Sequence, residues 1–349
     1  MSETVDHSEE ELRVFIKSFA EILKVSKDSL YAETVEDNNV KAQDLTAESI
    51  KLIQLIYAHT TKIGIAFRPP VSINAAYAQI KEISQYFFLL VSLVPLFQED
   101  PKFSKFFVSE LKVQVSKLIS TYTNFLKELG ELNFTEKADA STSNSVDHRL
   151  VSIGITWDMC DGLKKLILGG NLELLKENLK QSIALVDDAF EEFGEWIELP
   201  EKCDDTDPFG FNGAEEDDDD DDASENGDDK DDSEHIDPQL LSMAKKWHSK
   251  VKLIKLLLSS LSKSLPTDES GIKGADLEKF NQEQDHLIGL VDDLVSSFFT
   301  WSPIGDVQSY ADEIVEQCKN LIEMVKMLNK GDDSKIKWLK IWLERFVEN

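Results

Sequence analysis

A glutamate and a histidine lie three residues apart at Glu283 and His286, the spacing of a metal-binding pair on one face of a helix. A di-iron site in a helical bundle needs such a pair on each of two helices and two further glutamates. The chain has six histidines, and no second Glu-x-x-His sequence occurs. We therefore expect no metal.

A second pattern resembles a calcium-binding loop. Asp205, Asp207, Gly210 and Glu216 occupy positions 1, 3, 6 and 12 of that loop, but position 5, which needs an oxygen ligand, is Phe209. Aspartate is so frequent in this region that partial matches arise by chance. The pattern therefore does not predict calcium binding.

Motifs for phosphate binding and covalent catalysis are missing from the sequence. It contains no G-x-x-x-x-G-K-[ST], no G-x-G-x-x-G and no G-x-S-x-G. Cys160 and Cys318 fall within apolar stripes, where a cysteine usually serves as a small buried hydrophobic residue. We expect no catalytic residue and no cofactor, and we interpret the chain as a non-enzymatic protein.

Acidic residues dominate the 349-residue chain, with 67 Asp and Glu against 37 Lys and Arg, a formal net charge of −30. Residues 201–235 hold 13 Asp and 5 Glu against 2 Lys, a net charge of −16. Such a balance disfavours nucleic acid and anionic membranes and favours basic partners. We therefore expect protein partners, no nucleic acid and no membrane.

One acidic run inside residues 201–235 is a candidate docking tract: Asp217, Asp218, Asp219, Asp220, Asp221 and Asp222. Three interpretations are open, namely a solvating spacer, a docking site for a basic partner such as a histone, and a mimic that covers a basic face. Like charges repel and little apolar surface is present, so the sequence predicts disorder for the segment.

The elements that would position these residues are all helices. Apolar residues recur at steps of three and four from Ser8 onward, where Ser8 and Glu11 form a capping box. The first six predicted helices begin at Ser8, before Ile50, near Asn74, near Ser104, before Leu150 and at the cap Asn171. Pro69 and Pro70, Gly169 and Gly170, and Pro200 are predicted to end helices.

Four more helices follow the acidic segment, and the first begins with Asp237 as N-cap and Pro238 at the first helical position. The predicted fold is all-α, with two up-and-down helical bundles joined by a disordered acidic linker. The predicted divisions are a disordered N-terminus at 1–7, a bundle of about six helices at 8–200, the linker at 201–235 and a bundle of about four helices at 236–349.

Three widely spaced cysteines suggest a reducing compartment, and the acidic N-terminus does not resemble a secretory signal. The most apolar stretch, Tyr86 to Phe97, has about a dozen residues, whereas spanning a bilayer takes about 20. We interpret it as a buried bundle helix.

Several ordered motifs resemble the Grap2 and cyclin-D-interacting protein family, also called cyclin-D-binding protein homologues. The motif residues are Trp157 and Cys160, Asp187 and Asp188, Asp207, Pro208, Phe209 and Gly210, and Asp292 and Asp293. Their order across residues 150 to 300, with the acidic insert between them, carries the resemblance. No family motif is found in the N-terminal third.

This resemblance implies an all-α protein without catalytic residues that is found in cytoplasm and nucleus. It also implies cyclin-like, adaptor or transcriptional partners and a regulatory role in the cell cycle or transcription. Family members are described as helix-loop-helix proteins without a basic DNA-binding region, and this sequence likewise scatters its lysines around Lys245 to Lys255 among heptad residues. The resemblance does not imply an oligomeric state for this chain.

Two alternatives stay open beside this interpretation, an acidic chaperone-like binder of histones and a helical scaffold resembling vinculin and catenin. Trp157 and Cys160 lie on predicted core faces, so packing explains them equally well. Asp187 with Asp188 and Asp292 with Asp293 are less usual, because Asp is a poor mid-helix residue. We hypothesise that the two pairs face each other across the interface between the bundles.

Overall fold

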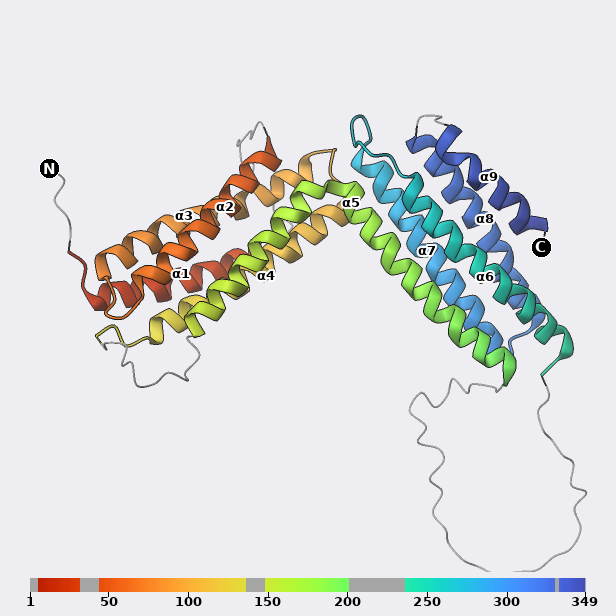
Figure 1. Cartoon of the computed structure of the whole chain (residues 1–349), viewed down its shortest axis with the longest axis horizontal. Helices are drawn as coiled ribbons and strands as arrows, with labels where there is room; N and C mark the ends of the chain where they lie inside the picture. Colours follow the sequence, from red (N-terminus) through yellow and green to blue (C-terminus); the bar gives the residue numbers. More distant parts are fainter. Residues whose placement is uncertain (1–5, 32–43, 136–147, 201–235, 330–332, 349) are drawn as a thin grey trace, which may run out of the picture. The chain divides into compact units, whose positions relative to one another are not determined.

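A computed structural model describes residues 6–31, 44–135, 148–200, 236–329 and 333–348 (Figure 1). Nine helices and no strand are assigned within these residues, so the predicted all-α fold is confirmed. Packing divides the chain into two compact units. Unit 1 comprises Met1–Leu174 and Glu269–Glu278, and unit 2 comprises Leu175–Asp268 and Lys279–Asn349.

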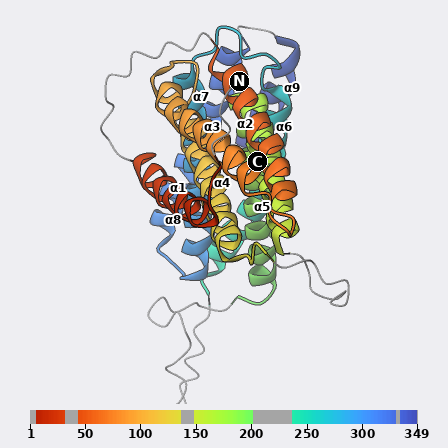
Figure 2. The ribbon, with the colours of Figure 1, turned by 90° about the vertical axis from the view of Figure 1, so that its left-hand side faces the viewer.

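Unit 1 is a helical bundle whose helices pack through their apolar stripes. It contains α1 (Glu9–Ser29), α2 (Leu45–Ala66), α3 (Ile73–Glu99), α4 (Lys105–Glu131) and the first part of α5 (His148–Glu198). The α3 helix packs against α1, α2 and α4, as Figure 2 shows from a second side. Aromatic side chains fill much of the core, among them Phe19, Phe67, Phe87, Phe97, Phe107, Tyr122 and Phe125.

Several predicted helix starts are confirmed by their hydrogen bonds. The Glu11 amide donates to the Ser8 hydroxyl at 3.1 Å, and the Ser8 amide donates to the Glu11 carboxylate at 2.8 Å. Ser104 caps α4 through the Phe107 amide at 3.1 Å. These bonds satisfy amides that have no partner within their helix, and so fix where each helix begins.

The predicted break at Gly170 is confirmed inside α5. Gly170 has φ 65° and ψ −162°, a conformation that side-chain-bearing residues rarely adopt, and the helices on either side meet at this kink. Asn171 was expected to cap the following helix. Its Oδ1 instead accepts from the Ser104 amide at 2.8 Å, and the Leu172 amide donates to the Glu269 carboxylate at 2.7 Å.

Residues 269–278 belong with unit 1 because their polar groups bond to it. Glu269 accepts from the side chain of Asn171 at 2.9 Å, and the Gly274 amide donates to the Pro101 carbonyl at 2.9 Å. The Glu278 carboxylate accepts from the Phe106 amide at 2.8 Å, near the start of α4. The segment thereby supplies carboxylates to two helix N-termini, where backbone amides favour negative charge.

Unit 2 is the second bundle, built from the rest of α5 with α6 (Pro238–Ser264), α7 (Gly274–Phe299, of which Lys279 onward belongs here), α8 (Ile304–Leu328) and α9 (Asp333–Glu348). The Asp237 carboxylate caps α6 through the Gln239 amide at 2.7 Å, so that predicted start is confirmed. The α6, α8 and α9 helices pack against one another. Paired polar side chains also link α5 to α7, as between Ser182 and Gln284 at 2.7 Å.

Unit boundaries differ from the predicted divisions. The sequence placed one bundle at 8–200 and the other at 236–349, whereas residues 175–200 pack with unit 2 and residues 269–278 pack with unit 1. Periodicity shows which residues form helices, but it does not show which helices pack together. The segment 201–235 lies outside the described residues, and the helices before and after it, the end of α5 and α6, are both in unit 2.

The α3 helix is long and apolar enough to cross a membrane by length and composition alone. The core helix of a bundle has the same properties. Ile80, Ile83 and Phe87 of α3 are buried in the core of unit 1, as the interpretation of a bundle helix requires, but Phe88 and Leu89 are exposed. That interpretation therefore holds for only part of the helix surface.

Candidate functional site

An apolar groove lies between α1 and α3 on the surface of unit 1. Both helices carry exposed apolar residues in addition to those buried in the core. In α1, Leu12, Ile16, Phe19 and Leu23 are buried, and Ile22 beside them is 56% exposed. The groove is therefore lined both by buried residues of the stripe and by exposed residues beside it.

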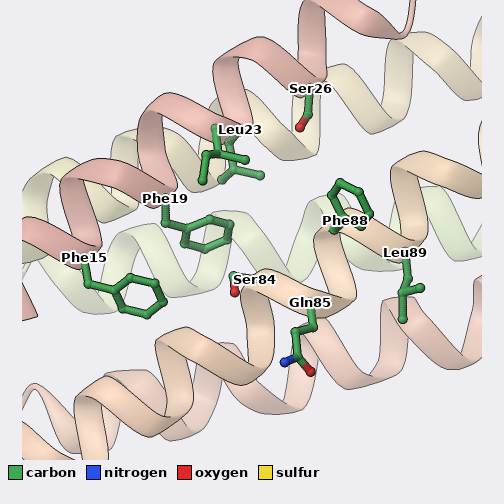
Figure 3. Close-up of a pocket in the computed structure, with 9 residues that line it drawn as sticks. Phe15, Phe19, Leu23, Ser26, Ser84, Gln85, Phe88 and Leu89 are labelled. Atoms are coloured by element: carbon green, nitrogen blue, oxygen red, sulfur yellow. The ribbon is translucent and has the colours of Figure 1, made fainter.

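The groove encloses a volume of about 490 Å³. Figure 3 shows Phe15, Phe19 and Leu23 of α1 on the side that faces α3, and Phe88 of α3 on the side that faces α1. Its lining contains no charged side chain and consists of Phe15, Phe19, Ile22, Leu23 and Ser26 from α1 and Ser84, Gln85, Phe88 and Leu89 from α3. A groove of this composition favours an apolar ligand surface over a charged one.

Two large apolar side chains of the groove are open to solvent. Phe88 is 67% exposed and Leu89 is 48% exposed. Val14 and Val25, also exposed, lie on the same face of α1 as Ile22 by helical spacing. Single exposed apolar residues are common, but a contiguous patch marks an interaction site.

Contacts at the beginning of α1 fix one end of the groove. The His7 ring stacks on Tyr77 of α3 at 3.6 Å, and Phe15 stacks on the same ring at 4.9 Å. The His7 amide donates to Asn74 Oδ1 at 2.8 Å. These contacts join the N-terminal ends of the two helices, so the groove is preformed there.

Arg13 holds α1 against the end of α4. Its Nη2 donates to the Leu132 carbonyl at 2.7 Å, its Nη1 donates to the Gly130 carbonyl, and its guanidinium lies 4.0 Å above the Phe134 ring. A second, smaller groove of about 360 Å³ runs beside Arg13 between α1 and α4. Lys17, Glu21, Lys127 and Glu131 line it with charge of both signs, so it is a weaker candidate for apolar binding.

The first family motif forms part of the core of unit 1. Cys160 is buried, and burial raises the pKa of its thiol to about 12, so the thiol is protonated at neutral pH. Trp157 is half-buried and stacks on Tyr57 of α2 at 5.2 Å. Both residues therefore join α5 to the bundle through packing.

The aspartate pairs lie together in unit 2. Asp187 is half-buried and forms an ion pair with Lys255 of α6, whereas Asp188, Asp292 and Asp293 are exposed. The hypothesis that the pairs face each other across an interface between the two bundles is wrong, because both pairs belong to one unit. Residue spacing could not show this, since it does not assign a helix to a unit.

Asp207, Pro208, Phe209, Gly210 and the tract Asp217–Asp222 lie outside the described residues. Glu283 accepts from Gln317 of α8 at 2.6 Å, and His286 is exposed. Among the described residues no cluster of three or more His, Cys, Asp or Glu has the arrangement of a metal site.

Known proteins share sequence with much of this chain. A profile described as Grap2 and cyclin-D-interacting, N-terminal matches residues 48–199. The family resemblance is confirmed over these residues. The match extends from α2 through α5, so it includes the α3 side of the groove and the Trp157 motif, while α1 precedes it.

Two yeast relatives of this chain are described as uncharacterized. YLR287C of Saccharomyces cerevisiae is 28% identical over 314 residues, which cover 87% of this chain and 86% of that protein. C22E12.18 of Schizosaccharomyces pombe is 22% identical over 199 residues, which cover 54% of this chain and 56% of that protein. The similarity to the first relative therefore extends well beyond the residues matched by the cyclin-D-interacting family.

The groove was missed by sequence reasoning, although one signal for it was present. Phe87, Phe88, Leu89 and Leu90 are four consecutive apolar residues, and a helix with one buried stripe covers only about half of such a run. Phe87 and Leu90 face the core, and Phe88 and Leu89 do not. A consecutive apolar run on a half-buried helix indicates a second apolar face.

Proposed function

We propose that this chain is a non-enzymatic regulatory protein that acts by binding other proteins. The observation that carries the proposal is the uncharged, preformed groove between α1 and α3, with Phe88 exposed at its edge. An exposed aromatic side chain beside a concave apolar surface is the usual anchor of a protein interface. The confirmed family resemblance supports the same class of function.

The groove suits an amphipathic helix of a partner protein. It runs between two helices, and α1 continues its apolar character through Val14, Ile22 and Val25. A third helix laid along it would bury apolar residues at positions i, i+3, i+4 and i+7, as helix-in-groove complexes do. The binding would be driven by apolar burial, because no charged residue lines the groove.

Partner identity is proposed from the family alone. The name of that family refers to cyclin D, so we propose a cyclin-like, adaptor or transcriptional partner and a role in cell-cycle or transcriptional control. Such partners would place the protein in the cytoplasm and the nucleus, which imaging of the tagged full chain would check.

Binding of a purified D-type cyclin tests this function, with Phe88→Asp compared against the wild-type chain. Loss of the exposed aromatic anchor is expected to weaken binding at least about tenfold. Leu185→Asp is the matched control, because Leu185 is 57% exposed on a helix of unit 2. That control should bind the cyclin as the wild type does.

Affinity purification with mass spectrometry extends the test to adaptors and transcription regulators, with the same two variants. The proposal requires at least one identified partner of these classes that is lost from Phe88→Asp and kept by Leu185→Asp. Equal recovery of all partners by both variants, with circular dichroism showing intact helices, would overturn the groove assignment. Recovery of no cell-cycle or transcriptional partner by the wild type would overturn the function.

A further inference from the structure

Charge is segregated within unit 2, and α6 is its basic element. The α6 helix contains six lysines and no aspartate or glutamate. Its neighbour α8 has five acidic residues and two lysines. A helix with six lysines and no carboxylate is unexpected in a chain with a net charge of −30.

Two of the six lysines are accounted for within the unit. Lys255 forms an ion pair with Asp187 of α5. Lys250 is buried, with its ammonium 5.2 Å from the centre of the Trp247 ring and 5.1 Å from that of Phe346 in α9. The α9 helix covers this flank of α6, and Trp342 of α9 donates to the Leu253 carbonyl at 2.8 Å.

Four lysines are left on the solvent face: Lys245, Lys246, Lys252 and Lys263. At 100° per residue they lie within an arc of about 120°, together with the exposed Leu256. Within the described part of the chain no carboxylate lies within ion-pair distance of any of them. Like charges on one helix face repel one another, so an acidic occupant would stabilise this face.

The chain's own acidic segment has the required charge and the required reach. Residues 201–235 carry a net charge of −16 and immediately precede α6. From Asp222 to the cap Asp237, an extended chain spans up to about 50 Å. The 27 residues of α6 span about 40 Å, so every exposed lysine is within reach.

Because it is covalently linked to α6, this segment competes better for the lysine face than a separate polyanion does. A tethered segment acts at an effective concentration in the millimolar range, whereas nucleic acid and anionic lipid meet the repulsion of the whole acidic chain. We propose that the exposed lysine face of α6 is the docking surface for the chain's own acidic segment at Asp217–Asp222. Docking holds the aspartates by charge and is therefore weakened by salt.

Lysine acylation footprinting of the intact protein tests this docking. The full chain is compared with a variant in which residues 215–234 are replaced by Ser and Gly at equal length. If the segment is docked about two thirds of the time, Lys245, Lys246 and Lys252 acylate about threefold more slowly in the full chain than in the variant. Lys51 and Lys105 of unit 1 are exposed and serve as controls that should not change.

Two additions identify the occupant. A peptide with the sequence of residues 215–234 should restore protection of α6 in the variant, and the same peptide with Asn for Asp should not. Raising the ionic strength should abolish protection in the full chain. Equal acylation of α6 in the full chain and the variant would overturn the proposal, and so would protection that appears only when an oligonucleotide or anionic vesicles are added.

Discussion

The two units are bundles of the same kind of amphipathic helix, yet their candidate binding surfaces differ in chemistry. Unit 1 leaves apolar side chains exposed beside its core, at Phe88 and Ile22. Unit 2 leaves lysines exposed on α6. The comparison shows that the buried stripe decides the fold, while the residues directly beside the stripe decide what the surface can bind.

Buried polar groups also differ between the units. In unit 1, Asn171 is fully buried and joins its own segment to Lys102 and Ser104 before α4 and to Glu269. In unit 2, polar contacts are pairs between neighbouring helices, such as Asn178 with Asn281 at 2.7 Å. Asn171 is therefore a polar centre of unit 1, whereas the contact between Asn178 and Asn281 joins one pair of side chains in unit 2.

The largest expected effect is on the free energy of unfolding, and it distinguishes a buried side chain of α3 from an exposed one. Phe87→Ala should lower the free energy of unfolding by about 3–5 kcal/mol, because a fully buried ring leaves a cavity. Phe88→Ala should change it by less than about 0.5 kcal/mol, because that ring is mostly in water. Urea unfolding of both variants measures the difference, and a large loss for Phe88→Ala would show that the groove is part of the core.

The next effect concerns the polar centre of unit 1. Asn171→Ala should cost about 2–4 kcal/mol, because it leaves the buried Ser104 amide without its acceptor. The control is Asn178→Ala in unit 2, where loss of one half-buried hydrogen bond should cost about 0.5–1.5 kcal/mol. Similar losses for both variants in urea unfolding would contradict the view that Asn171 is a polar centre of unit 1.

Binding at the α1–α3 groove and docking on the α6 lysines should differ in their dependence on salt concentration, without a large change in the free energy of unfolding. Partner binding to the α1–α3 groove should vary little between low and high salt, because apolar burial is not screened. Protection of the α6 lysines should fall steeply over the same range. Calorimetric titration measures partner binding, and acylation footprinting of the same samples measures protection of the lysines. A steep salt dependence of groove binding would contradict the apolar character of the groove.

The smallest expected effect is a pH dependence confined to unit 1. Burial, reinforced by Lys62, lowers the pKa of His59 below its ordinary value of 6.5. The unfolded chain then takes up a proton more readily than the folded chain, so stability falls as the pH drops through about 6.5 and levels off below the lowered pKa.

Hydrogen exchange at about pH 7.5 and about pH 5.5 measures this effect in each unit, after correction for intrinsic exchange rates. His59→Asn should reduce the pH dependence of unit 1. His286→Asn in unit 2 is the control, because His286 is exposed. An unchanged pH dependence in His59→Asn would assign the effect to other groups.

Local features of the fold could be predicted from the sequence because their causes are local. The Ser8–Glu11 capping box, the Asp237 cap before Pro238 and the break at Gly170 each follow from a few neighbouring residues. Asn171 lies at the predicted break, but its side chain bonds to Ser104 and does not cap the helix that follows. Its partners at Ser104 and Glu269 are 67 and 98 residues away, and no local pattern identifies them.

The candidate surfaces could be predicted only in part. The lysines of α6 were interpreted as scattered among heptad residues, although their helical spacing places Lys245, Lys246 and Lys252 on one face. What the sequence could not show is that Lys250 is covered by α9 and Lys255 is paired with Asp187. Those contacts, which decide which charges stay free, depend on packing between distant helices.

Because Glu269 and its segment complete unit 1, that unit is discontinuous along the chain. During synthesis the ribosome delivers α1 to α4 first, and the carboxylates that bond the Leu172 and Phe106 amides follow those amides by 97 and 172 residues. Unit 1 therefore finishes folding only after most of the polypeptide has emerged. A gene fragment that ends at residue 200 encodes all the groove residues but yields a bundle that lacks these two caps.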